Sequence, residues 1–206
     1  MTGYIVGATV VGASAVLTDG PLLERLLAIT IPAFGFWFAV SITRTILGFE
    51  QIVFYEAAGA AWAATLVAGL VAGLDPWRVS DLVVVLIASF NTFGRIGCYH
   101  VACCHGRPAR FGVRYGHEHA RLGFPRRWVG RALVPIQLAE SVASAGLALA
   151  GAAVVLAGTR SGTATIAFVD GYALVRFACE LARGDAAFIG HAGEAPRDAR
   201  EVLHQL

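Results

Sequence analysis

Long apolar stretches separated by short polar turns make up most of this chain of 206 residues. A helix needs about 20 mostly apolar residues to cross the hydrocarbon core of a bilayer. The candidates for such helices are residues 5–17, 22–47, 52–74, about 82–99, 133–157 and 163–183. Because backbone in lipid must satisfy its own hydrogen bonds, we predict an all-α fold. It is a polytopic transmembrane helical bundle of about six spans, with no sheet.

The composition favours lipid as the solvent for most of the chain. Hydrophobic residues make up 57% of it and charged residues only 15%, whereas soluble domains are about 45–50% apolar. The net charge of +2 is too small to indicate nucleic-acid binding. We expect residues 1–183 to form the bundle and the polar residues 184–206 to form a tail outside the bilayer. The start lacks the basic residues of a cleavable signal, so we expect the first helix to be retained.

Two of the apolar stretches carry further predictions. Ser80 and Asp81 have side chains suited to helix caps and should begin the fourth helix. The third stretch is rich in alanine and glycine, which let membrane helices approach closely. Glu56, near its start, either pairs with an arginine of another helix or accepts a proton.

The segment 91–108, with the sequence NTFGRIGCYHVACCHGRP, concentrates chemistry at the end of the fourth helix. Arg95 follows a long apolar run, and an arginine at membrane depth is costly and by default marks a functional site. Asn91, Arg95 and Cys98 are four and then three residues apart, so they share one helix face. We expect that face to point into the bundle.

The same segment contains five possible metal ligands, Cys98, His100, Cys103, Cys104 and His105. Zinc sites usually combine a short cysteine pair with a distant second pair, which is lacking here. We therefore expect no metal and no other cofactor. Buried cysteines often act as small apolar side chains, and a Cys98–Cys103 disulfide is an alternative in an oxidising compartment.

Charged and polar residues also lie within the last two stretches. Arg176 and Glu180 are four residues apart and share a helix face, with Arg183 three residues further on. They form either a neutralised structural pair or part of a site. Gln137 and Glu140 are three residues apart. They either form part of a site or make hydrogen bonds between helices.

Four blocks in collinear order, across roughly residues 55–185, resemble the prolipoprotein diacylglyceryl transferase family. Residues 95–97 (Arg-Ile-Gly), followed by residues 106–108 (Gly-Arg-Pro), resemble its signature. Residues 135–140 (Pro-Ile-Gln-Leu-Ala-Glu) resemble its Pro-Thr-Gln-Leu-Tyr-Glu block. Residues 171–172 (Gly-Tyr), with Arg176, Glu180 and Arg183, resemble its last block. The small-residue third helix stands where the family has its His-Gly-Gly helix.

The resemblance implies a multi-pass enzyme of the bacterial inner membrane. Such an enzyme moves a diacylglyceryl group from phosphatidylglycerol to the thiol of a prolipoprotein cysteine and leaves glycerol phosphate. It implies that Arg95 and Arg176 hold the phosphate, and that Glu180 orients Arg176 or shares in proton handling. Gly106 would allow close backbone approach. The remaining substrate-binding residues would be Asn91, Arg107, Gln137, Glu140 and Glu56.

The base that assists the thiol is a separate prediction. His105 is the first candidate, because it stands beside Gly106, where we expect the mouth of the cavity, and histidine titrates near neutral pH. His100 is the second candidate and Glu56 the third. The alternative for His105 is a loop residue exposed to water.

The sequence also departs from the family pattern. Cys98 stands where the signature has asparagine, Cys103 where it usually has glutamate, and Val134 where a histidine precedes the Pro-Thr-Gln block. The third helix has Glu56 but no histidine, and the last span is missing. Two alternatives therefore stay open: a related phospholipid head-group transferase with another acceptor, and a non-catalytic lipid-binding membrane protein.

The orientation is also open. The many arginines of the loop at 105–131 favour its cytoplasmic placement, whereas the resemblance implies the outer face, which we favour.

Overall fold

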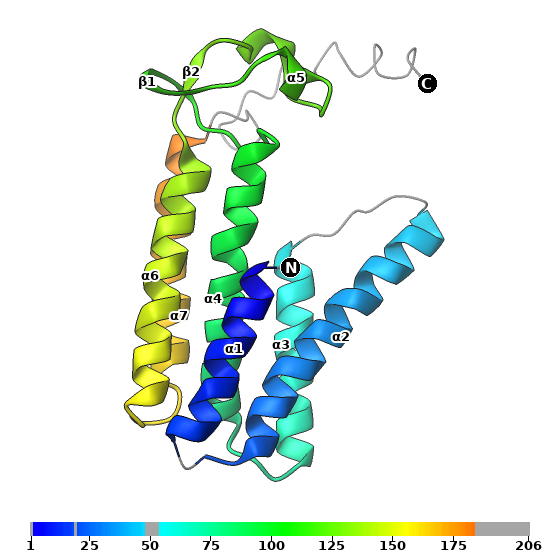
Figure 1. Ribbon diagram of the computed structural model, residues 1–206, viewed down its shortest axis with the longest axis vertical. Coiled ribbons are helices and arrows are strands. Elements are labelled where there is room, and N and C mark those ends of the chain that lie inside the picture. Colours follow the sequence, from blue (N-terminus) through cyan, green and yellow to red (C-terminus); the bar gives the residue numbers. More distant parts are fainter. Residues whose placement is uncertain (1, 19, 48–53, 184–206) are drawn as a thin grey trace.

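The computed structural model describes residues 2–18, 20–47 and 54–183, apart from some side chains between 39 and 56, and consists mainly of helices. The tail predicted from residue 184 lies outside the described residues. Six long helices correspond to the six apolar stretches (Figure 1). They are α1 (Thr2–Leu17), α2 (Leu22–Leu47), α3 (Phe54–Val71), α4 (Pro76–His100), α6 (Ile136–Leu156) and α7 (Thr163–Ala182).

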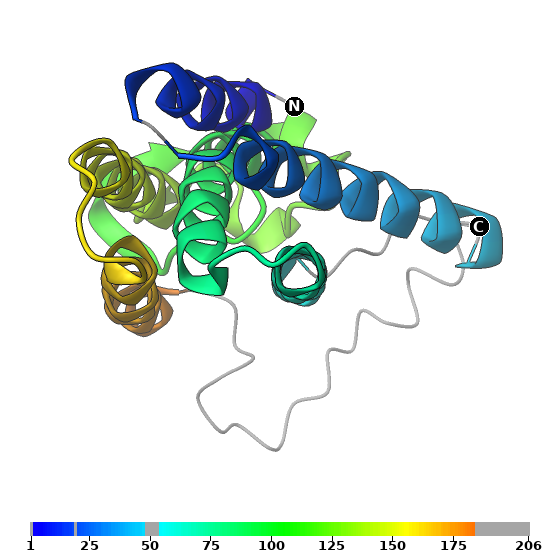
Figure 2. The same cartoon turned by 90° about the horizontal axis from the view of Figure 1, so that it is seen from below.

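Helix α4 is the centre of the bundle. It packs against α1, α2, α3, α6 and α7, and the view along the helices shows the others arranged around it (Figure 2). Every residue from Val79 to Leu86 is buried, so this part of the helix has no face exposed to solvent. Because α4 packs against the other long helices, its side chains can reach several of them.

The start of α4 differs from the sequence prediction. Asp75 is the N-cap and accepts a hydrogen bond from the Trp77 backbone N–H at 3.0 Å, and Pro76 occupies the first turn, where proline needs no hydrogen-bond partner. The helix therefore begins before Ser80 and Asp81, which do not cap it. Asp81 instead caps α7: its carboxylate accepts from the Gly162 N–H and the Thr165 N–H, both at 2.8 Å.

Helix α1 lies unusually close to α4 because its contact face carries glycine. A Cβ atom on Gly3 would stand 2.6 Å from the Ser89 carbonyl oxygen and 2.9 Å from the Phe90 Cα. Gly7, one turn later, would meet the Leu86 side chain at 3.0 Å. Only glycine permits this backbone approach, as in other membrane helix pairs.

A small sheet contradicts the prediction that the chain forms no sheet. Strands β1 (Pro108–Arg114) and β2 (Ala132–Leu133) pair in antiparallel orientation. With the short helix α5 (His117–Ala120) and the 3₁₀ turn η1 (Arg126–Trp128), they form a cap over the ends of α4, α6 and α7 (Figure 1). The cap has its own apolar core of Ala102, Tyr115, Phe124 and Leu133. An open sheet is excluded only for backbone inside lipid, and these strands lie beyond the ends of the helices.

The outer surface of the bundle is apolar. On α2, for example, Phe34 and Trp37 are 64% and 62% exposed. Among the described residues, α4 and α6 are long and apolar enough to cross a membrane, and α1 and part of α3 are apolar but shorter. The helical bundle and two candidate spans are thus established, while the count of six spans stays a prediction.

Candidate functional site

Three helices bring charged side chains together near the capped end of the bundle. Arg95 of α4 contacts Glu140 of α6, with 2.7 Å between Nη2 and Oε1. Arg176 of α7 contacts the other oxygen of the same carboxylate, with 3.5 Å between Nη1 and Oε2. Glu140 therefore holds two guanidinium groups that belong to different helices.

The network continues along α7. Glu180 accepts from Arg176 one turn earlier and from Arg183, whose Nη1 lies 3.2 Å from Oε1. The hydroxyl of Tyr172 donates to Glu140 Oε1 at 2.8 Å. Three arginines thus surround two carboxylates, and we call these five charged residues the arginine cluster.

Burial makes this arrangement energetically consequential. Glu140 is 2% exposed and Arg95 is 9% exposed. A buried ion costs several kcal/mol unless opposite charge and hydrogen bonds compensate it, so Glu140 and its two arginines depend on one another. Arg176, Glu180 and Arg183 are about a quarter exposed, and the cluster is therefore open on the side of α7.

The polar residues of α6 that precede and follow Glu140 hold the helices together. Gln137 donates from Nε2 to the Cys103 carbonyl at 2.6 Å, and Asn91 of α4 donates to the Ser144 hydroxyl at 2.8 Å. Both side chains are thus engaged in hydrogen bonds between segments, the alternative that the sequence left open for Gln137. A role for either in substrate binding stays a prediction.

Gly106 and Arg107 join the cap to the end of α7. Gly106 is buried, and a Cβ atom there would collide with the Val134 carbonyl. The Arg107 N–H donates to the Ala182 carbonyl at 3.0 Å, while the Arg107 side chain is exposed. The close approach that Gly106 permits in this structure is to the chain itself, and it keeps the cap beside the arginine cluster.

The three candidates for the base are placed differently. His105 is only 7% exposed, and its ring packs edge-on against Phe124 and Trp128 of the cap. This burial rules out the alternative of a loop residue exposed to water. His100 is exposed at the end of α4, and the side chain of Glu56 lies outside the described residues.

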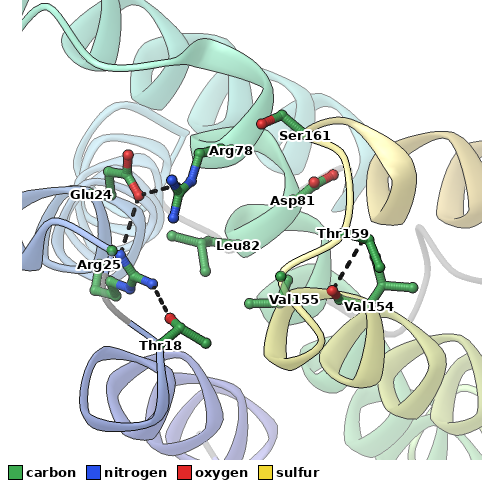
Figure 3. A pocket seen from close by; sticks show the side chains of 12 residues that line it. Thr18, Glu24, Arg25, Arg78, Asp81, Leu82, Val154, Val155, Thr159 and Ser161 are labelled. Atoms are coloured by element: carbon green, nitrogen blue, oxygen red, sulfur yellow. Dashed lines mark hydrogen bonds and ion pairs between the residues drawn. The ribbon is translucent and has the colours of Figure 1, made fainter.

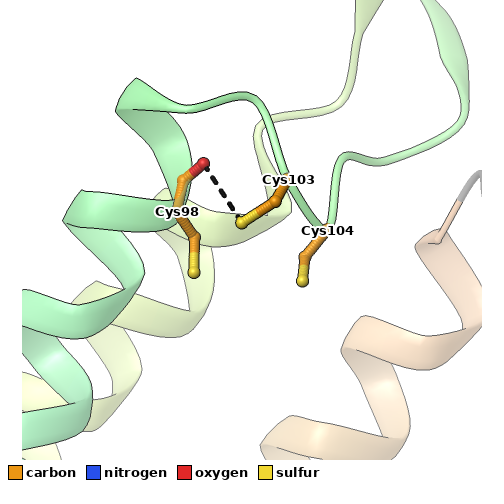
Figure 4. A group of neighbouring side chains, drawn as sticks. All are labelled: Cys98, Cys103 and Cys104. Atoms are coloured by element: carbon orange, nitrogen blue, oxygen red, sulfur yellow. Dashed lines mark hydrogen bonds between the residues drawn. The ribbon is translucent and has the colours of Figure 1, made fainter. Parts of the chain in front are cut away.

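Three thiols converge where α4 meets the cap (Figure 4). The sulfur atoms of Cys98, Cys103 and Cys104 all lie within 4.8 Å of one another, and all three are free thiols. The neighbouring thiols of Cys103 and Cys98 lower the pKa of the Cys104 thiol, and the positive charges of Arg95 and Arg183 lower it further. Cys103 is exposed, so it is not the small buried apolar residue that the sequence favoured.

A cavity of about 300 Å³ lies at the opposite end of the bundle, and Figure 3 shows its charged wall. Glu24 Oε2 contacts Arg25 Nη1 at 3.2 Å and Arg78 Nε at 3.6 Å. Arg25 also donates to the Thr18 hydroxyl at 2.7 Å. With Asp81, which also lines the cavity, two carboxylates balance the charges of Arg25 and Arg78, so this wall lacks the surplus positive charge of the arginine cluster.

The fold and the arginine cluster define a helical membrane protein whose charged side chains meet inside the bundle. Comparison with protein families gives a match to prolipoprotein diacylglyceryl transferase over residues 52–195. Because this match covers more than half of the chain, the protein belongs to the prolipoprotein diacylglyceryl transferase family, whose members are membrane enzymes. Comparison with curated proteins and with solved structures gave no match.

Proposed function

We propose that this protein transfers a diacylglyceryl group from phosphatidylglycerol to the cysteine thiol of a prolipoprotein, with glycerol phosphate as the leaving group. The observation that carries the proposal is the arginine cluster, in which three guanidinium groups surround two carboxylates. The surplus of positive charge suits an anion such as a lipid phosphate. Family membership supports this class of reaction.

The chemistry requires positive charge that is already in position. When the bond between the glyceryl carbon and the phosphate oxygen breaks, negative charge grows on the phosphate. Donors that are fixed beforehand stabilise such charge most effectively. Glu140 contacts Arg95 and Arg176 through its two oxygens, so both guanidinium groups are oriented before the lipid arrives. The planar guanidinium fork matches phosphate oxygens better than a lysine would.

The proposal also assigns a setting. The chain would be a multi-pass protein of the bacterial cytoplasmic membrane, with about six spans. Its partners would be phosphatidylglycerol and a prolipoprotein. The exposed apolar side chains of the bundle would meet the acyl chains of the bilayer.

The test is transfer of a labelled diacylglyceryl group from phosphatidylglycerol vesicles to a lipobox peptide. Arg95→Ala and Arg176→Ala should each lower turnover at least about tenfold, because a hydrogen bond to a charged group contributes about 1.5–3 kcal/mol. Arg95→Lys should restore part of the rate. Arg160→Ala is the matched control, since Arg160 is exposed in the turn between α6 and α7, far from the cluster. Unchanged turnover in Arg95→Ala would refute the phosphate role.

The same assay separates the remaining alternatives. His105→Ala, His100→Ala and Glu56→Gln identify the base, which is the variant that loses transfer while it still binds the lipid. An unmutated protein that binds phosphatidylglycerol but transfers nothing to peptide or small thiols is a lipid-binding protein. Transfer to a small thiol or alcohol but not to the peptide indicates a different acceptor.

A further inference from the structure

The three thiols converge because the backbone between them is bent in an uncommon way. Ala102 and Cys104 both have left-handed backbone conformations, with φ of 58° and 52°. A residue with a Cβ atom rarely adopts such a conformation, because the Cβ atom comes too close to the following carbonyl oxygen. In an extended segment, adjacent side chains point to opposite sides, yet the sulfur atoms of Cys103 and Cys104 both lie within 4.8 Å of that of Cys98 (Figure 4).

Other contacts keep this turn in place. The Cys103 N–H donates to the Cys98 carbonyl at 3.2 Å, and its thiol donates to the same carbonyl at 3.7 Å. The Cys103 carbonyl accepts from Gln137, which is 1% exposed. Helix α6 therefore positions the turn, and the spatial arrangement of the thiols is built into the packing.

The distances and the charge around the thiols suit a metal ion. A tetrahedral zinc site with Zn–S bonds of about 2.3 Å separates its sulfur atoms by about 3.8 Å. The three sulfur atoms, already within 4.8 Å, need to close by at most about 1 Å to reach that geometry. Three thiolates and one divalent ion have a net charge of −1. Arg95 and Arg183, whose charges act on Cys104, offset that charge.

We propose that Cys98, Cys103 and Cys104 form a three-thiolate site for a zinc ion, with the fourth position open to the thiol of the acceptor. Catalytic zinc sites have three protein ligands and one open position, and thiolates select soft or borderline ions of this kind. The exposure of Cys103 and the partial exposure of the other two thiols leave the fourth side accessible. The identity of the acceptor rests on the proposed function, whereas the metal site does not.

The metal site would take the place of a base for the acceptor thiol. Glu140 and Glu180 are both engaged by arginines, and His105 is buried beneath the cap. A thiol that coordinates a metal ion loses its proton, which passes to water. The zinc-bound sulfur then attacks the glyceryl carbon and forms a C–S bond. The C–O bond to the phosphate breaks, and its electron pair leaves with glycerol phosphate.

The first experiment measures zinc in the full-length protein, purified in detergent under reducing conditions and incubated with zinc chloride. We expect one zinc ion per chain. Cys98→Ser, Cys103→Ser and Cys104→Ser should each lower the zinc content at least tenfold. Cys179→Ser is the matched control, because Cys179 is a buried thiol of α7 outside the three-thiol group. Circular dichroism verifies that each variant keeps its helices.

The second experiment replaces zinc with cobalt(II), whose thiolate complexes absorb in the near ultraviolet. A lipobox peptide should alter this absorption, and the same peptide with serine in place of cysteine should not. Fewer than 0.1 zinc ions per chain, or equal zinc content in Cys104→Ser and Cys179→Ser, would overturn the metal site. A cobalt spectrum that the peptide leaves unchanged would overturn the open position. Transfer by metal-free protein would refute the metal's role and leave the proposed function intact. Bound zinc without transfer would refute the proposed function and leave the metal site intact.

Discussion

Replacing Glu140 with glutamine should destabilise the bundle strongly, because one buried carboxylate serves two arginines. Glutamine keeps the shape of the side chain and one oxygen acceptor, so the change removes mainly the charge. At an effective dielectric constant of about 20, charges about 4 Å apart interact by about 4 kcal/mol. The second ion pair, with the partly exposed Arg176, contributes less interaction energy. Glutamine also avoids the desolvation cost of a buried charge, which offsets part of the loss. We expect a net cost of about 3 kcal/mol, at the lower end for breaking a buried ion pair.

The free energy of unfolding can be measured by titration with sodium dodecyl sulfate in mixed micelles, followed by circular dichroism. A loss of about 3 kcal/mol corresponds to a roughly 150-fold change in the unfolding equilibrium constant. The matched variant is Glu180→Gln, in the same cluster but about a quarter exposed, where we expect about 1 kcal/mol or less. If Glu140→Gln costs no more than Glu180→Gln, the reasoning from burial is wrong.

Three smaller predictions use the same unfolding measurement. Gly3→Ala should lower the free energy of unfolding by about 1–3 kcal/mol, because its methyl group meets the backbone of α4. Gly12→Ala, with open space around its Cα, should be neutral or stabilising. Equal effects of the two changes would exclude close packing as the cause. Asp81→Ala should lower the free energy of unfolding by about 1–3 kcal/mol. It should also speed amide exchange at the start of α7, where Asp81 accepts hydrogen bonds from backbone N–H groups. Unchanged exchange there would contradict the capping role. Tyr172→Phe removes one hydrogen bond to Glu140 and should cost about 1 kcal/mol, and a stabilising effect would argue against that bond.

Hydropathy and charge in the sequence predicted the helical part of the fold. Helix α2 was predicted with its observed limits, Leu22–Leu47, because a proline turn precedes it. The start of α6 was predicted three residues early, since Ala132 and Leu133 pair with β1 instead. The cap was not predicted as a sheet because β1 is mostly exposed on both faces, and no alternating pattern marks it.

The contacts of the arginine cluster could be predicted in part. The resemblance implied that Arg95 and Arg176 share one phosphate and that Glu180 orients Arg176, and charges inside an apolar bundle must pair. Which glutamate serves both arginines depends on the rotation of α6, which packing decides. The three-thiol group could not be predicted, because it depends on the left-handed conformations of Ala102 and Cys104. Neither residue is a type that favours such a conformation.

The pairing of Arg95 with Glu140 has a consequence for the synthesis of the protein. The two residues lie on α4 and α6, so the ribosome completes the arginine-bearing helix first. At roughly 5–20 residues per second, Glu140 follows a few seconds later. During that interval α4 enters the bilayer without its carboxylate partner. Arg95 lies near the end of α4, so the cost is below the value of about 2.5–3.5 kcal/mol for a central arginine. We therefore expect insertion of α4 to depend on the translocon until α6 arrives.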